Sequence, residues 1–82
     1  NIVGKRVKEA RRTLRPKLTQ DQLSGKLASE GVSLDRAAIA KIETGIRRVS
    51  DFELRAIAKV LGLDVRWLLG IKSGVQPETI SK

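Results

Sequence analysis

The chain has no cysteine, histidine, methionine or tyrosine, and only one tryptophan and one phenylalanine among its 82 residues. Without cysteine or histidine, disulfides, zinc knuckles and imidazole chemistry are excluded, and we predict neither a metal nor a cofactor. Binding of single-stranded nucleic acid by stacking needs a platform of several rings, which Phe52 and Trp67 do not provide. We interpret both as core or subunit-contact residues.

Long apolar runs and catalytic patterns are also missing. No run approaches the roughly 20 apolar residues that span a bilayer, and no signal peptide is recognisable. Serine and acidic residues occur, but none forms the pattern of an activated nucleophile, so we expect no enzyme activity. The sequence starts at Asn1 rather than methionine, so we expect residues upstream in the full protein.

Positive charge is in excess. Lysine and arginine number 17 against nine acidic residues, which gives a net charge of +8. Such a field favours polyanions, with nucleic acid first and an anionic membrane surface second. The length allows one small domain with a single core.

Apolar spacing and capping residues predict five short helices and no strand. In the first segment the apolar stripe is Val3, Val7, Ala10 and Leu14, and Pro16 predicts its end at about Arg15. Four later helix starts are predicted from caps at Thr19, Asp35, Ser50 and Asp64. Thr19 with Gln22, and Ser50 with Glu53, form capping boxes. Plausible C-terminal stops are Gly31, Gly45, Gly62 and Gly70.

These signals predict an all-α fold, a compact bundle of five short helices in a domain over residues 1–70. Residues 71–82 contain Gly74 and Pro77 and have little periodicity, so we interpret them as a linker or flexible tail. As an alternative, Ile71, Val75 and Ile80 pack on the domain or on a second copy.

The segment Asp35–Gly45 predicts a helix with two different faces. Ala38, Ile39 and Ile42 lie on one side, the ordinary core-facing stripe. The opposite side consists of Arg36, Ala37, Ala40, Lys41 and Thr44. Two cations therefore flank a strip of small residues, which would allow a partner to approach closely.

The runs LTQDQLSGKL, AIAKIETG and DFELRAIAKVLGLDVRWLLG resemble the Cro/repressor-type helix-turn-helix domain of the XRE family. The resemblance implies a lambda-repressor-like fold and a prokaryotic or phage-like regulator that acts in the cytoplasm at the nucleoid. The connection with Pro16 and the span from Leu27 to Ile39 are both longer than in compact family members. The added residues either lengthen the second helix or enlarge the loop after it.

The resemblance also implies which residues bind DNA. The helix over about 36–44 would enter the major groove, where Ala37 and Ala40 permit close approach and contact thymine methyl groups. Arg36 would bond a guanine, while Lys41 would reach a base or a phosphate equally well. The alternative is a solvated helix face with two surface cations.

Further residues are expected to contact the DNA backbone, and for Gln20 the resemblance itself implies this role. Gln20, at the first position of the second helix, would clamp a phosphate; otherwise it is a polar residue on a capped surface helix. Arg47 and Arg48 would grip phosphates from the following loop, or else only keep the surface soluble. Some of the seven cations of the N-terminal segment add to this electrostatic footprint: Lys5, Arg6, Lys8, Arg11, Arg12, Arg15 and Lys17.

For Glu43, an acid beside the DNA-facing strip, the resemblance implies a structural ion pair with Arg11. The alternative is a freely solvated carboxylate. Dimer contacts are expected at the fifth helix, from Trp67 and Ile71, and they would match a pseudo-palindromic operator.

The sequence thus predicts a sequence-specific regulator of transcription, a repressor, that binds double-stranded DNA as a homodimer. An antitoxin or a restriction-system controller would have the same DNA chemistry. From another class, a basic protein-interaction or membrane-surface module remains as an alternative.

Overall fold

The computed structural model describes residues 2–71, in which five α-helices and no strand are found. They are α1 (Ile2–Thr13), α2 (Gln20–Ser29), α3 (Arg36–Glu43), α4 (Asp51–Leu61) and α5 (Val65–Leu69). The predicted all-α bundle of five short helices is confirmed. The interpretation of the tail falls mostly outside the described residues, which include Ile71 but neither Val75 nor Ile80.

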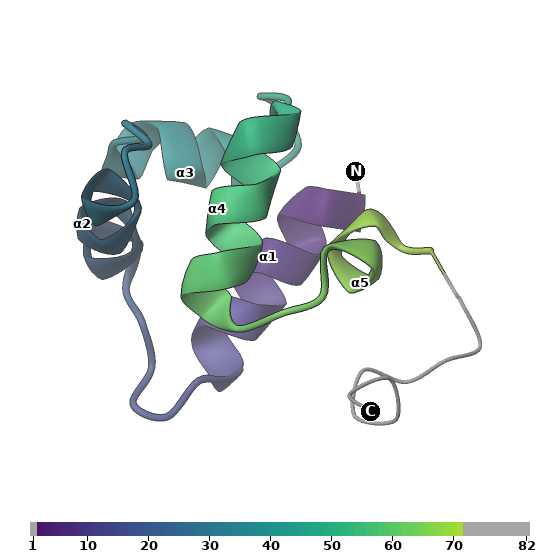
Figure 1. Cartoon of the computed structure of the whole chain (residues 1–82), viewed down its shortest axis with the longest axis horizontal. Helices are drawn as coiled ribbons and strands as arrows, with labels where there is room; N and C mark the ends of the chain where they lie inside the picture. Colours follow the sequence, from purple (N-terminus) through teal and green to yellow (C-terminus); the bar gives the residue numbers. More distant parts are fainter. Residues whose placement is uncertain (1, 72–82) are drawn as a thin grey trace.

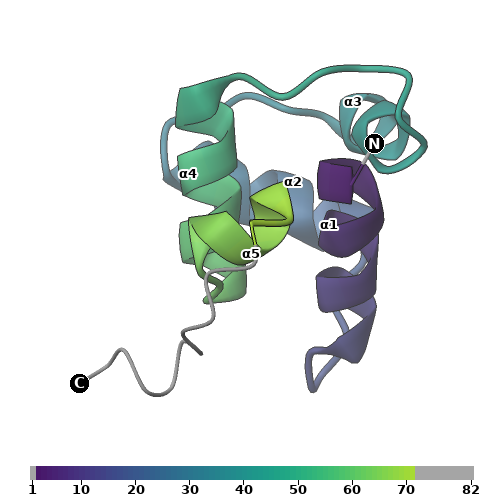
Figure 2. The same cartoon turned by 90° about the vertical axis from the view of Figure 1, so that its right-hand side faces the viewer.

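The helices pack around one core. α1 contacts α3, α4 and α5, while α2 contacts α3 and α4. Figure 1 shows α4 in front of α1, with α2 and α3 on one side and α5 on the other. Figure 2 shows α3 nearly end-on beside the N-terminal end of α1. Each helix contributes to the fully buried side chains, which are Val7, Leu23, Leu27, Ile39, Ile42, Ile57 and Leu68.

Side-chain caps fix where the helices begin. The Thr19 hydroxyl accepts a hydrogen bond from the Gln22 backbone N–H at 3.0 Å, and the Gln22 side chain accepts one from the Thr19 N–H at 2.8 Å. Ser50 and Glu53 form the same reciprocal box at the start of α4. Both predicted capping boxes are therefore present. They satisfy backbone donors that no helical carbonyl can reach.

The connection between α2 and α3 is part of the core. α2 ends at Ser29 and α3 begins at Arg36, so the connection is residues 30–35. Its apolar residues Val32 and Leu34 are buried, and the Ser24 hydroxyl donates to the Leu34 carbonyl oxygen at 2.7 Å. The connection therefore holds α3 in a defined position relative to α2.

At Gly4, α1 and α3 approach each other closely. Gly4 is buried, and a β-carbon there would overlap the carbonyl oxygen of Ile42 and lie 3.2 Å from the carbonyl carbon of Glu43. Only glycine lets the backbones pack at this distance. The sequence analysis did not single out this residue.

Two expectations need correction. α1 ends at Thr13, before the predicted end near Arg15, and its last helical hydrogen bond is donated by the Leu14 N–H to the Ala10 carbonyl oxygen. Of the two positions predicted for Phe52, core or subunit contact, the core is excluded, since Phe52 is 59% exposed. The buried stripe of α4 includes Leu54, Ile57 and Leu61, and Phe52 lies off that stripe.

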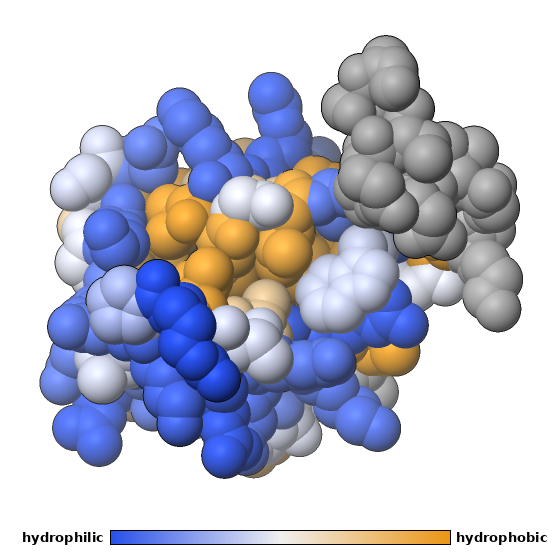
Figure 3. All heavy atoms as spheres, turned by 90° about the horizontal axis from the view of Figure 1, so that it is seen from below, coloured by the Kyte–Doolittle hydropathy of each residue, from blue (hydrophilic) through white to orange (hydrophobic). Residues whose placement is uncertain are grey.

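The core is not completely covered on the side away from α3. Figure 3 views the molecule from below and shows apolar side chains within a rim of polar ones. Apolar residues that pack half-buried against the core include Leu14, Val60, Leu63, Val65 and Trp67.

Candidate nucleic-acid interface

The outer face of α3 is open and has little bulk. Asp35 caps the helix, with its carboxylate accepting from the Ala38 N–H at 2.8 Å. From this start, Arg36, Ala37 and Lys41 are exposed and Ala40 is half-buried. The opposite face is buried in the core through Ile39 and Ile42. The structure therefore presents the small residues and the two cations together on one side.

Thr44 ends this face. It is the C-cap residue rather than the last residue of the helix, which ends at Glu43. Its hydroxyl donates to the carbonyl oxygens of Ala40 at 3.1 Å and Lys41 at 3.2 Å. Thr44 stays exposed, although its own hydroxyl proton is directed into the helix.

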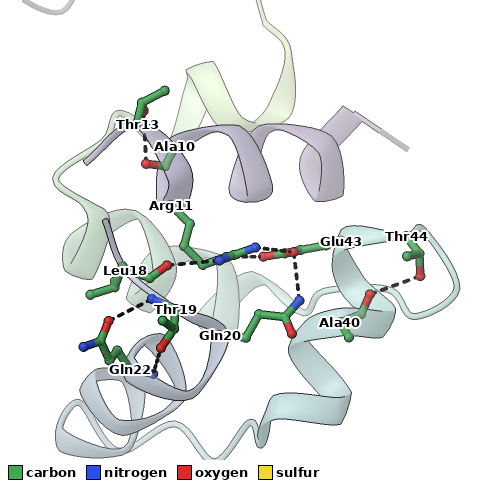
Figure 4. Close-up of polar contacts among 10 residues, drawn as sticks. All are labelled: Ala10, Arg11, Thr13, Leu18, Thr19, Gln20, Gln22, Ala40, Glu43 and Thr44. Carbon is green, nitrogen blue, oxygen red and sulfur yellow. Dashed lines mark hydrogen bonds and ion pairs between the residues drawn. The ribbon is translucent and has the colours of Figure 1, made fainter. Parts of the chain in front are cut away.

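A buried carboxylate connects α1, α2 and α3. The guanidinium of Arg11 donates to Glu43 through Nε at 2.8 Å and Nη2 at 3.0 Å, as Figure 4 shows. The Glu43 side chain is only 2% exposed and that of Arg11 12%. The ion pair that the family resemblance implied is therefore present. Because a bidentate pair neutralises the charge, Glu43 is compatible with a polyanion beside α3.

Gln20 joins this pair, a contact that the sequence analysis missed. Its Nε2 donates to Glu43 Oε1 at 3.0 Å (Figure 4). A primary amide has two N–H donors, so one is used internally and the other is left for a ligand. Glu43 thereby orients the residue expected to clamp a phosphate.

Arg36 lies at the edge of a hollow between the starts of α2 and α3. The same hollow is lined by Arg11, Thr19, Gln20 and Asp21. The Arg36 Nη1 is 3.8 Å from a carboxylate oxygen of Asp21, and both side chains are about 70% exposed, at 69% and 72%. Such an exposed pair contributes little, so Arg36 can leave Asp21 for a base.

Arg47 and Arg48, paired in the sequence analysis, differ in the structure. The Arg47 guanidinium donates to both carboxylate oxygens of Glu53 at 3.1 Å. This hydrogen bond is the main cause that lowers the pKa of Glu53, and the same contact raises the pKa of Arg47. Arg48 is exposed and has no side-chain partner within the described part of the chain. Arg48 is therefore the freer of the two cations.

Trp67 lies against α1. The Arg6 guanidinium is 4.7 Å from the centre of the indole ring, and its Nη1 donates to the Trp67 carbonyl oxygen at 2.7 Å. Sixty-one positions separate the two residues, so no local spacing could have predicted the contact. Trp67 is half-buried, while Ile71 is 53% exposed next to the end of α5.

A helix-turn-helix family model matches residues 7–68. The chain belongs to that helix-turn-helix family. The match extends from α1 to α5 and confirms the resemblance to the XRE family. Searches of curated proteins and of solved structures found no match.

Membership of the helix-turn-helix family makes the chain a DNA-binding domain of the transcription-regulator type, with double-stranded DNA as its partner. The family is not typically enzymatic. Residues 2–71 contain no group of three or more side chains that could hold a metal ion. Over the same residues, no helix has the length and apolar character needed to cross a membrane.

Proposed function

We propose that the domain is a sequence-specific regulator that inserts α3 into the major groove of duplex DNA and represses transcription by occupying its site. The observation that supports this most directly is the exposed, low-bulk face of α3. The groove is about 12 Å wide, so a helix enters only if bulky side chains do not block its face.

The proposal gives the exposed residues separate roles. Arg36, in the first turn, reads a guanine, and Lys41 contacts a second base or a phosphate. Ala37 and Ala40 let the helix approach the base edges, and Thr44 lies at the end of the same face. Gln20 and Arg48 hold the backbone on either side of the groove. A bacterial or phage-encoded regulator of this kind would act in the cytoplasm, where its DNA is.

Glu43 supports this arrangement through its ion pair with Arg11 and its hydrogen bond with Gln20. The pair with Arg11 removes the repulsion that a free carboxylate would exert on phosphate. Its bond to Gln20 fixes the direction of that amide before DNA arrives, which lowers the entropy lost on binding.

The test begins with selection of bound duplexes from a random pool, followed by titration of the selected and of a random duplex. Arg36→Ala should cost about 1–3 kcal/mol on the selected duplex and much less on the random one. Equal losses on both would identify Arg36 as a phosphate contact and contradict the assignment. A pool without any enriched sequence would contradict specific recognition itself.

A further inference from the structure

A second basic hollow runs beside α1, apart from the one between α2 and α3. It is lined by five exposed cations, Lys5, Lys8, Arg12, Arg15 and Lys17. Two acids, Glu9 and Glu43, also line it. We call these five cations and the hollow between them the α1 groove.

The positive charge of the α1 groove is not balanced by carboxylates. Glu43 is already neutralised by Arg11, which leaves Glu9 as the one unpaired acid in the lining. Within residues 2–71, every ion pair involves a cation outside the groove: Arg11, Arg36, Arg47, Lys59 and Arg66. Like charges that no carboxylate balances repel one another, so an anion from outside would stabilise this face.

The spacing of these cations suits a nucleic-acid strand. Lys5, Lys8 and Arg12 lie three and four residues apart, which puts them in a row along one side of α1. At 1.5 Å per residue the row is about 10 Å long. One DNA strand carries a phosphate about every 3.4 Å of axis, so a row of this length is long enough to contact more than one phosphate.

The two hollows share a wall. Arg11 lines the hollow that contains Gln20 and Arg36, and its partner Glu43 lines the α1 groove. We propose that the α1 groove binds the phosphate backbone of duplex DNA as a continuation of the contact made at Gln20. This inference rests on the proposed function and lengthens the DNA segment that one domain covers.

A membrane surface fits this face less well. A helix that lies on lipid exposes an apolar face to it, whereas the apolar residues Val7 and Ala10 of α1 are buried in the core. The side chains that line the α1 groove are polar or charged throughout. Their net positive charge favours an anionic ligand, and a phosphate backbone offers such charges in a row.

The test compares two double variants that remove equal charge. Lys8→Gln with Arg12→Gln changes the α1 groove, and Lys26→Gln with Arg55→Gln changes exposed cations outside both hollows. If two phosphate contacts are lost, the slope of log affinity against log salt should flatten by about 1.8 for the first variant. Its affinity should fall roughly tenfold for selected and random duplex alike. The control should keep most of the wild-type slope.

Glu9→Gln should act in the opposite direction and tighten binding severalfold.

Duplex length provides a second readout. Wild-type affinity should rise until the duplex is long enough to reach the α1 groove, and the groove variant should stop gaining at a shorter length. Two findings together would overturn the inference: equal salt slopes for the two double variants, and the same duplex length at which their affinity stops rising. The proposed function would still stand if the wild-type protein bound duplex DNA. Wild-type protein that binds anionic vesicles but no duplex would overturn both. Thermal unfolding of each variant verifies that the fold is kept.

Discussion

At the scale of single residues, Arg47 and Arg48 are neighbours with different availability. Arg47 already donates two hydrogen bonds to Glu53, so a phosphate would have to compete with a carboxylate. We predict that Arg48→Ala weakens both selected and random duplex and flattens the salt dependence by about one unit. Arg47→Ala should have clearly less than half of that effect. Gel shifts over a salt series measure both, and an equal loss would show that Arg47 leaves Glu53 on binding.

Glu53 makes part of the stability depend on pH. Its pKa is held below the ordinary value of 4.5, first of all by the hydrogen bond from Arg47. Since the folded pKa is the lower one, this stabilisation is present above the unfolded value and is lost as pH falls through the folded value. Glu53→Gln should therefore cost about 1 kcal/mol at neutral pH, a modest amount because Arg47 is partly exposed. The difference from wild type should shrink in acid.

Urea titrations of wild type and Glu53→Gln at neutral pH and at about pH 3 measure this change. Glu9→Gln is the matched control, because Glu9 is exposed and has no ion-pair partner among the described residues. A Glu53→Gln cost that is the same at both pH values would contradict an origin in the carboxylate charge, because glutamine can still complete the capping box.

At the scale of helices, the contact of α1 with α3 depends on Gly4, which has no side chain. Gly4→Ala would drive a methyl group into the Ile42 carbonyl, and because backbone cannot move aside cheaply, we expect a loss of about 2–3 kcal/mol. Gly25 is the control, since it lies on the exposed side of α2 with nothing within 4 Å of a β-carbon. Gly25→Ala should stabilise by about 0.5–1 kcal/mol. Chemical denaturation measures both, and two changes of the same sign would contradict the close approach.

The helices could be predicted from the sequence where the interactions that define them join residues close together in the chain. Thr19 and Gln22 are three residues apart, so the sequence itself indicates that they form a capping box. The Arg11–Glu43 pair came from the family resemblance, since 32 positions separate its members.

The Gln20–Glu43, Arg6–Trp67 and Gly4–Ile42 contacts arise only when the helices pack, and no spacing rule specifies them. The exposure of Phe52 has a related cause. Large aromatic residues are usually buried, but the register of α4 had already assigned its core positions to aliphatic side chains.

At the scale of the whole molecule, one recognition helix reads too few bases to select a single site. We predict a weak dimer that forms mainly on DNA, with contacts around Trp67 and Ile71 and inverted half-sites about 34 Å apart. Sedimentation should show monomer at micromolar concentration, while titration of the selected duplex should saturate at two chains. Saturation at one chain per duplex, on a site without internal symmetry, would contradict the dimer model.

The position of Trp67 also makes the protein its own optical probe. It is the only tryptophan and there is no tyrosine, so the near-ultraviolet emission reports a single place, the seam between α1 and α5 where Arg6 lies on the indole. Emission and far-ultraviolet dichroism should change together during unfolding if α5 stays attached until the bundle opens. A fluorescence change at lower denaturant concentration would instead show that α5 detaches first. The same emission, followed during a DNA titration, would report whether the contact between α1 and α5 changes when the complex forms.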